Sequence, residues 1–291
     1  MDKIEKNTVK YLIPKRPENS NKGTFGRILT IAGSLNYQGA AYLSAVSALK
    51  SGAGLVSLAT IETVINNISA LTPNLTFLKL RDSYKQCIAS DSFPEIKPFL
   101  DKYNVIAMGP GLSDNPAVFA FVNEALGFMK DIETPVVLDA DALNAIADSK
   151  ITKLPKNSII TPHPKEMSRL LDVSLEEILA DRANAAKRAV EKFNCTVILK
   201  GSGTIVCTKD FRFFVNTSGS SALAKAGSGD VLTGIISAFL AQGLSCENAA
   251  IAGVFLHGLC GEIAAESLTE YCVLAQDVID AIPEAFKRIL G

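Results

Sequence analysis

A glycine-rich segment that ends in an aspartate has the residue types needed for chemistry at a phosphate. It begins the stretch AGSGDVLTGII, residues 226–236, whose second half has helical composition. Glycines at the start of a helix let backbone N–H groups approach an anion, and the helix dipole favours negative charge there. A carboxylate in the first turn, Asp230, can take the proton from a hydroxyl that attacks phosphorus. The alternative is an ordinary helix start, capped by the side chains of Ser228 and Asp230.

A second loop with two glycines, KGSGT over residues 200–204, follows an apolar run typical of a strand. Its amides and hydroxyls could hold a nucleotide, with Lys200 as a cation. A tight turn between two strands is the alternative reading, and a single G-x-G is weak support. Neither glycine-rich loop matches the P-loop or the Rossmann pattern.

The two histidines stand in different surroundings. His163 lies between Pro162 and Pro164, which restrain the backbone on both sides. We therefore expect His163 to be held rigidly at a strand end, where it contacts a ligand. His257 lies inside an apolar helical stretch and is expected to be a hydrogen-bonded core residue.

Two carboxylates and an amide, Asp139, Asp141 and Asn144, follow another apolar run. They could order a metal-bound phosphate or a polar substrate. The alternative is capping of the next helix by Asp139 or Asp141.

The elements that position these groups alternate between strand-like and helical patterns. Helical patterns cover residues 40–51 and 116–129, and an antiparallel hairpin is expected over 205–207 and 211–215 at the sheet edge. The predicted strands are residues 27–32, 55–60, 104–108, 135–138, 158–160 and 195–199. This alternation predicts an α/β fold with a mostly parallel sheet. Because each polar cluster directly follows a strand, the clusters should converge at the carboxyl ends of the strands.

Composition narrows the class of protein. Lys plus Arg is 29 and Asp plus Glu is 30, so a net charge of −1 provides no general attraction to nucleic acid or an anionic membrane. The six cysteines form no C-x-x-C pair and are interpreted as reduced thiols. The N-terminus has no secretory pattern, and two apolar stretches, residues 231–246 and 249–261, are expected to be buried helices. These features favour a soluble, cytoplasmic protein.

Taken together, the motifs resemble one family, the NAD(P)H-hydrate dehydratases of the ribokinase-like superfamily. They run in the family's order over nearly the whole chain after residue 22. The matching segments are KGTFGRILTIAGS (22–34), YQGAAYLSAVSALKSGAGLVS (37–57), MGPGL (108–112), PVVLDADALN (135–144), TPHPKE (161–166), KGSGT (200–204) and SGSSALAKAGSGDVLTG (218–234).

The resemblance implies a three-layer α/β/α sandwich and a repair reaction. Members use ADP or ATP to restore hydrated NADH or NADPH, acting on the S-epimer of the hydrate. It also implies Mg²⁺-assisted transfer of a phosphoryl group to the hydrate hydroxyl, followed by loss of phosphate. No metal ligand in the chain is assigned.

The same resemblance assigns roles to individual residues. Asp230 corresponds to the catalytic base. The amides of Gly227, Ser228 and Gly229 form an anion hole. The nucleotide contacts correspond to Lys200, Gly201, Ser202, Gly203, Thr204 and Gly229. Contacts to the hydrated dinucleotide correspond to Ala41, Gly111, His163 and Asp230, with Asn144 as a further candidate.

One position departs from the family pattern. Gly219 is followed by Ser220 where the family usually has asparagine, so an amide contact is missing. We expect residues 1–291 to form one domain, with residues 1–22 as an N-terminal arm and no fused epimerase domain. A separate epimerase and a tetrameric assembly are further expectations.

Two alternatives remain. A vitamin-precursor or sugar kinase of the same superfamily would use Asp230 in the same way, although the surroundings of His163 and Gly111 match the dehydratases better. A non-catalytic ADP sensor would not need a base at residue 230.

Overall fold

The computed structural model describes residues 1–291 and contains one ten-stranded sheet. Its strand order is β1-β10-β9-β8-β7-β6-β5-β2-β3-β4. All neighbours are parallel except β10 with β9 and β9 with β8. The strands are β1 (Asp2–Ile4), β2 (Arg27–Ile31), β3 (Leu55–Ile61), β4 (Thr76–Leu80), β5 (Val105–Met108), β6 (Val136–Leu138), β7 (Ser158–Ile160), β8 (Thr196–Leu199), β9 (Ile205–Cys207) and β10 (Phe213–Asn216).

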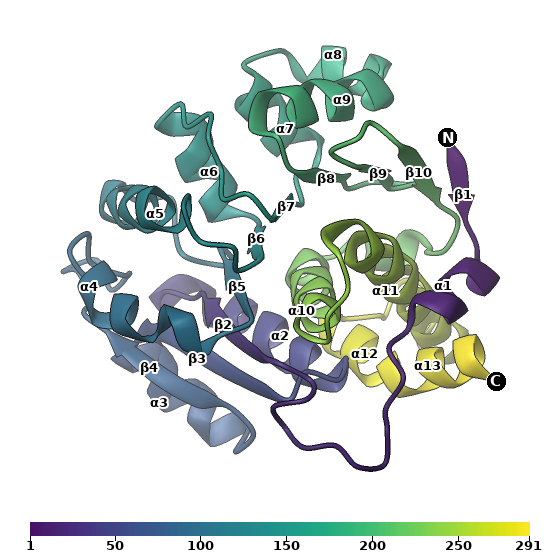
Figure 1. Cartoon of the computed structure of the whole chain (residues 1–291), viewed down its shortest axis with the longest axis horizontal. Coiled ribbons are helices and arrows are strands. Elements are labelled where there is room, and N and C mark those ends of the chain that lie inside the picture. The colour runs from purple at the N-terminus through teal and green to yellow at the C-terminus, as the bar shows by residue number, and fades with distance from the viewer.

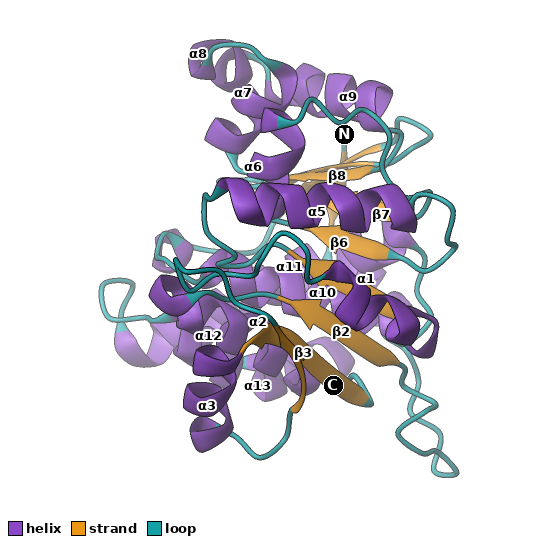
Figure 2. Ribbon diagram, turned by 90° about the vertical axis from the view of Figure 1, so that its left-hand side faces the viewer, coloured by secondary structure: helices purple, strands orange, loops and turns teal.

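Helices cover both faces of this sheet (Figures 1 and 2). On one face α2 and α10 pack against each other and against the central strands, with α11 beside them; α5, α6, α7 and α9 lie over the other face. The helices are α1 (Lys6–Leu12), α2 (Gln38–Lys50), α3 (Glu62–Leu71), α4 (Phe93–Ile96), α5 (Pro116–Met129), α6 (Asp141–Asp148), α7 (Pro164–Leu171), α8 (Leu175–Ala180), α9 (Arg182–Phe193), α10 (Ser228–Ala241), α11 (Cys246–Leu268), α12 (Ala275–Asp280) and α13 (Ile282–Leu290).

The central strands β5 to β8 are buried along their whole length because both of their faces are covered. Every residue of β5, β6, β7 and β8 is buried. Such continuous burial is typical of parallel sheets between helical layers, where no face alternates with solvent. The α/β/α sandwich predicted from the sequence is therefore confirmed.

The N-terminal arm is more structured than the sequence pattern predicted. Residues 2–4 form β1, which pairs in parallel with β10 and occupies the sheet edge expected for the hairpin. The hairpin itself is confirmed, although its second strand is Phe213–Asn216 rather than residues 211–215. The prediction of the edge was wrong because only Ile4 of the three β1 residues is buried, which leaves no alternation to detect.

The two apolar stretches are helices α10 and α11, as predicted. Helix α11 has 23 residues, more than either apolar stretch suggested, and is the one helix long and apolar enough to cross a membrane. Of its most apolar window, 78% is buried inside the protein. It packs against α10, α13 and β10, which is the environment of a core helix.

Candidate active site

A cavity of about 810 Å³ opens at the carboxyl ends of β6, β7 and β8. It is lined by residues from four of the predicted clusters: Asp139 after β6, His163 after β7, the loop 200–204 after β8, and residues 227–230 at the start of α10. Segments far apart in the sequence thus meet in one place, as their positions after strands predicted.

The start of α10 presents backbone donors to this cavity. Gly227, the residue before the helix, has a left-handed backbone (φ 90°), and no side chain caps the helix. The alternative of a capped helix start is therefore wrong. The N–H groups of Gly227, Gly229 and Asp230 have no acceptor within the protein, whereas Ser228 N–H donates to the Lys225 carbonyl at 3.3 Å. Three open amides at a helix start form an anion site.

His257 anchors this helix start from the neighbouring helix α11. Its Nε2 lies 2.9 Å from the Ser228 carbonyl oxygen and 3.1 Å from Ser228 Oγ. Burial lowers the pKa of His257 to about 4, so the ring is neutral and Nε2 donates to the carbonyl. The prediction of a hydrogen-bonded core histidine is confirmed.

Asp230 has the ionisation expected of a base working near neutral pH. Burial, and next the negative charge of Asp139, raise the pKa of Asp230 to about 7, while Lys200 opposes the shift. A general base is most effective when its pKa lies near the working pH. No hydrogen-bond partner within the protein occupies the Asp230 carboxylate, which lines the cavity.

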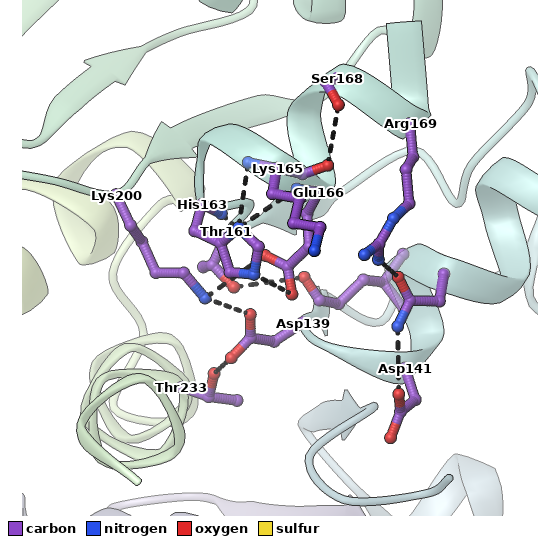
Figure 3. Close-up of polar contacts among 12 residues, drawn as sticks. Asp139, Asp141, Thr161, His163, Lys165, Glu166, Ser168, Arg169, Lys200 and Thr233 are labelled. Carbon is purple, nitrogen blue, oxygen red and sulfur yellow. Dashed lines mark hydrogen bonds and ion pairs between the residues drawn. The ribbon is translucent and has the colours of Figure 1, made fainter. Parts of the chain in front are cut away.

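Asp139 links the loop 200–204, the predicted nucleotide-binding loop, to helix α10 (Figure 3). One carboxylate oxygen lies 2.7 Å from Lys200 Nζ, and the other accepts a hydrogen bond of 2.8 Å from Thr233 Oγ1. Asp139 is 1% exposed, so this is a buried ion pair. Burial would lower the pKa of Lys200, but Asp139 and Glu166 raise it overall, which keeps the lysine charged.

Neither Asp139 nor Asp141 caps helix α6, so that alternative is also wrong. The residue before the helix is Ala140, with φ 48° and ψ −118°, and no side-chain cap is present. This is a sparsely populated backbone conformation for a residue with a Cβ. The two carboxylates on either side of Ala140 have separate partners: Asp139 pairs with Lys200, and Asp141 accepts a hydrogen bond of 2.8 Å from Ser113 N–H.

His163 is fixed as the flanking prolines predicted. Its Nδ1 accepts hydrogen bonds from the amides of Lys165 (3.1 Å) and Glu166 (3.2 Å), and Glu166 accepts one of 2.7 Å from His163 N–H. This capping box begins helix α7. Burial, and then the charge of Lys200, lower the pKa of His163 to about 4. His163 is thus a neutral ring whose Nε2 carries the proton.

The loop 200–204 is braced from α9 by an arginine that the sequence did not single out. Arg182 donates to the carbonyls of Ser202 (2.7 Å) and Leu199 (3.1 Å). A Cβ added to Gly201 would meet this guanidinium at 2.9 Å. Turn glycines and the guanidinium together fix the direction of the loop's backbone.

Three of the predicted substrate contacts, Ala41, Gly111 and Asn144, do not line the cavity. Ala41 is fully buried in α2. The carbonyl of Gly111, after β5, accepts a hydrogen bond of 2.9 Å from Ser34 Oγ. Asn144 bonds to Asp141 and to Arg169. Their roles toward a substrate remain predictions.

The residues present do not build a magnesium site of their own. No group of three or more His, Cys, Asp or Glu side chains is arranged to hold a metal. The carboxylates that line the cavity include Asp139 and Glu166, which already pair with Lys200 and with the His163 amide. Mg²⁺ commonly binds through one or two carboxylates together with substrate phosphates.

Comparison with known proteins assigns the chain to a family. The family model described as NAD(P)H-hydrate dehydratase matches residues 28–284. This chain belongs to that family. An ADP-dependent (S)-NAD(P)H-hydrate dehydratase from Bacillus subtilis is 34% identical over 280 residues, which is 96% of each chain. Other curated relatives, named bifunctional NAD(P)H-hydrate repair enzymes, are longer, and the chain spans about half their length.

Solved structures of family relatives have the same fold. The ADP/ATP-dependent NAD(P)H-hydrate dehydratase from Bacillus subtilis, co-crystallised with ATP and Mg²⁺, superposes with a TM-score of 0.86 at 31% identity, covering 99% of this chain and 98% of that one. A ribokinase-like superfamily protein from Enterococcus faecalis has a TM-score of 0.87 at 26% identity, covering 99% and 96%. The ribokinase-like fold of this dehydratase-family chain is therefore confirmed.

Several residues of this site were not assigned from the sequence. Asn216, Ser218 and Lys225 line the cavity next to the α10 start. Asn216 Nδ2 donates to the carbonyls of Ser218 (3.1 Å) and Val254 (3.0 Å), so it orders its loop. Ser220 also lines the cavity, and its Oγ accepts from Ala222 N–H at 3.2 Å. The strand-end signal could have found Asn216, which ends β10.

Proposed function

We propose that this chain is an ADP- or ATP-dependent dehydratase that converts the S-epimer of hydrated NADH or NADPH back to NAD(P)H. The observation that carries the proposal is the start of α10. There a carboxylate with a pKa of about 7, Asp230, stands beside the open amides of Gly227 and Gly229 and faces a cavity of about 810 Å³. Family membership supplies the substrate class.

The first step is transfer of a phosphoryl group to the hydrate hydroxyl. The nucleotide lies along residues 200–204, with its terminal phosphate pointing toward α10. The nucleotide also contacts Gly229. Asp230 takes the hydroxyl proton as the oxygen attacks phosphorus. The bond between the terminal phosphorus and its bridging oxygen breaks, so ADP yields AMP, and ATP yields ADP.

The open amides stabilise the charge that develops during this transfer. The N–H groups of Gly227, Gly229 and Asp230 are fixed before the substrate arrives, because His257 and the α10 backbone hold them. Preorganised donors of this kind cost no reorganisation at the moment of reaction. The amide of Ser228, already bonded to Lys225, contributes less than the sequence suggested.

The second step restores the nicotinamide ring. Phosphate leaves as the lone pair of the ring nitrogen forms a double bond to the carbon that carried it, and loss of a proton from the next ring carbon gives the dihydropyridine. His163, Gly111 and Ala41 contact the dinucleotide. His163 is neutral, so its Nε2–H can donate a hydrogen bond to a polar ligand atom.

The wider setting follows the family. We infer that residues 1–291 act as one dehydratase domain, that the protein works in the cytoplasm, and that it assembles as a homotetramer. Six free cysteines suit a reducing compartment. Longer relatives are named bifunctional repair enzymes, which supports a partner activity that interconverts the two hydrate epimers.

The test mixes purified protein with hydrated NADH, Mg²⁺ and either ADP or ATP, and follows the near-ultraviolet absorbance of NADH. Nucleotide-dependent recovery of the signal is expected. Asp230→Asn should abolish turnover while nucleotide binding, measured by calorimetry, stays close to that of the unmodified protein. Folded protein that restores no NADH with either nucleotide would contradict the proposal and favour a small-molecule kinase.

A further inference from the structure

Both polar atoms of the Asn144 amide are hydrogen-bonded within the protein, which changes the role expected for it. Its Oδ1 accepts a hydrogen bond of 2.5 Å from Arg169, and its Nδ2 donates one of 3.1 Å to Asp141 Oδ1. Asp141 in turn accepts from Ser113 N–H at 2.8 Å. This chain of bonds from the β5 loop to α7 orients the guanidinium of Arg169, and Figure 3 shows its part between Asp141 and Arg169.

The network lies where a long ligand must pass. In the sheet, β6 lies between β5 and β7. Gly111 follows β5, and His163 follows β7. A dinucleotide that contacts both must cross the end of β6, next to Asn144 at the start of α6 and to Arg169.

Two positive charges stand at this crossing. Lys165 and Arg169 are exposed and lie one turn apart on α7, the helix that His163 caps. Neither is in an ion pair, and four of the five Arg169 N–H donors have no partner within the protein. In Figure 3 both side chains extend from α7 toward the strand ends.

The neighbouring carboxylates do not cancel these charges by direct pairing. Asp139 pairs with Lys200, and Glu166 accepts from the His163 amide. The charge of Arg169 also reaches the site, since it contributes, after burial and Lys200, to the lowered pKa of His163.

We propose that Arg169, oriented by Asn144 and assisted by Lys165, binds a phosphate group of the hydrated dinucleotide. This inference rests on the proposed function for its substrate class. A planar guanidinium with free paired donors suits bidentate binding of a phosphate. Both dinucleotides carry a pyrophosphate, and only the NADPH form carries a further phosphate on its ribose. Asn144 is then a positioning residue rather than a substrate contact.

The experiment measures binding of NADH and NADPH, separately, through the fluorescence of the reduced nicotinamide. Arg169→Gln should raise the Kd at least about tenfold, the scale of one charge-assisted hydrogen bond. Arg169→Lys should raise the Kd less than Arg169→Gln does, because lysine keeps the positive charge but lacks the paired N–H donors of the guanidinium. Asn144→Ala should weaken binding to a smaller extent than Arg169→Gln. Lys187→Gln on α9, another exposed lysine, is the matched control and should leave both Kd values unchanged.

Comparing the two dinucleotides identifies which phosphate group Arg169 binds. Weaker binding of both NADH and NADPH by Arg169→Gln assigns Arg169 to the pyrophosphate, and weaker binding of NADPH alone assigns it to the ribose phosphate. Unchanged binding of both by folded Arg169→Gln overturns the proposal, as does an equal loss of ADP affinity. Because these are binding measurements, they remain decisive even if the repair assay fails, so the two proposals fail separately.

Discussion

Removing the charge of Asp139 should move the pH dependence of the enzyme in a defined direction. Asp139 is the second cause, after burial, of the raised pKa of Asp230, which is about 7. In Asp139→Asn that contribution disappears, and Lys200, no longer held by a carboxylate at 2.7 Å, is free to turn toward Asp230. Both changes lower the pKa of Asp230.

The structure gives the scale of the shift. Both carboxylates line the same cavity, and Asp139 is the largest charge contribution to the raised pKa of Asp230. At an effective dielectric constant of about 20, two like charges about 8 Å apart interact by ~2 kcal/mol, and about 1.4 kcal/mol corresponds to one pKa unit. We expect the pKa of Asp230 to fall by about one to two units.

The assay is the pH profile of kcat/KM, which reports the ionisation of the free enzyme. Asp230 acts when ionised, so activity is lost as the pH falls through its pKa. Asp139→Asn should therefore retain activity to lower pH. Thr233→Val is the matched control, because it removes the hydrogen bond of 2.8 Å to Asp139 and keeps the charge. In Thr233→Val the acid limb should stay in place. An acid limb that also stays in place, or moves to higher pH, in Asp139→Asn would refute the reasoning.

Three further predictions concern the backbone around the cavity. Gly227→Ala should destabilise the protein by about 2–4 kcal/mol, because Gly227 has φ 90° and the new Cβ would lie 2.6 Å from Leu43 Cδ1; chemical denaturation measures this, and an unchanged midpoint would contradict it. Ala140→Gly should stabilise by about 1 kcal/mol in the same experiment, since φ 48° with ψ −118° strains alanine; a loss of stability would show that no strain is stored there. Arg182→Gln should raise the KM for ADP about tenfold with little change in kcat, because the loop 200–204 loses two charge-assisted hydrogen bonds; a fall in kcat alone would contradict a bracing role.

Sequence patterns predicted most of the sheet because burial on both faces leaves a direct mark. Residues 158–160 and 116–129 were predicted with the bounds that the structure has, as β7 and α5. The short edge strand β1 left no such mark: its place depends on pairing with β10 and on the hydrogen bond of 2.6 Å from Thr217 Oγ1 to the Ile4 carbonyl. These partners lie more than 200 residues further along the chain, so no local pattern could reveal the strand.

The same distinction applies to the site. The sequence predicted the loops whose backbone geometry depends on glycine or proline. These are the AGSGD segment and the loop with the histidine between two prolines. Capping, by contrast, was the alternative that residue type suggested for Ser228 and Asp230 and for Asp139 or Asp141, and in the structure none of these side chains caps a helix. Asp139 instead meets Lys200, which is 61 residues away. A buried carboxylate must pair with a group that balances its charge, and the tertiary fold determines which group lies close enough to do so.

Long side chains on helices were the hardest to assign, because their function depends on which strand end they reach. Arg182 and Arg169 occupy unremarkable helical positions in the sequence, yet one braces the loop after β8 and the other is oriented across the end of β6. Asn144 was predicted as a substrate contact because the segment 139–144 follows a strand, although Asn144 itself lies on helix α6. Its Oδ1 accepts from Arg169 and one of its two Nδ2–H donors is bonded to Asp141, so most of the donors left to face a ligand belong to the arginine. A residue at a strand end thus indicates where a ligand lies, and the hydrogen bonds that it makes decide which neighbour binds that ligand.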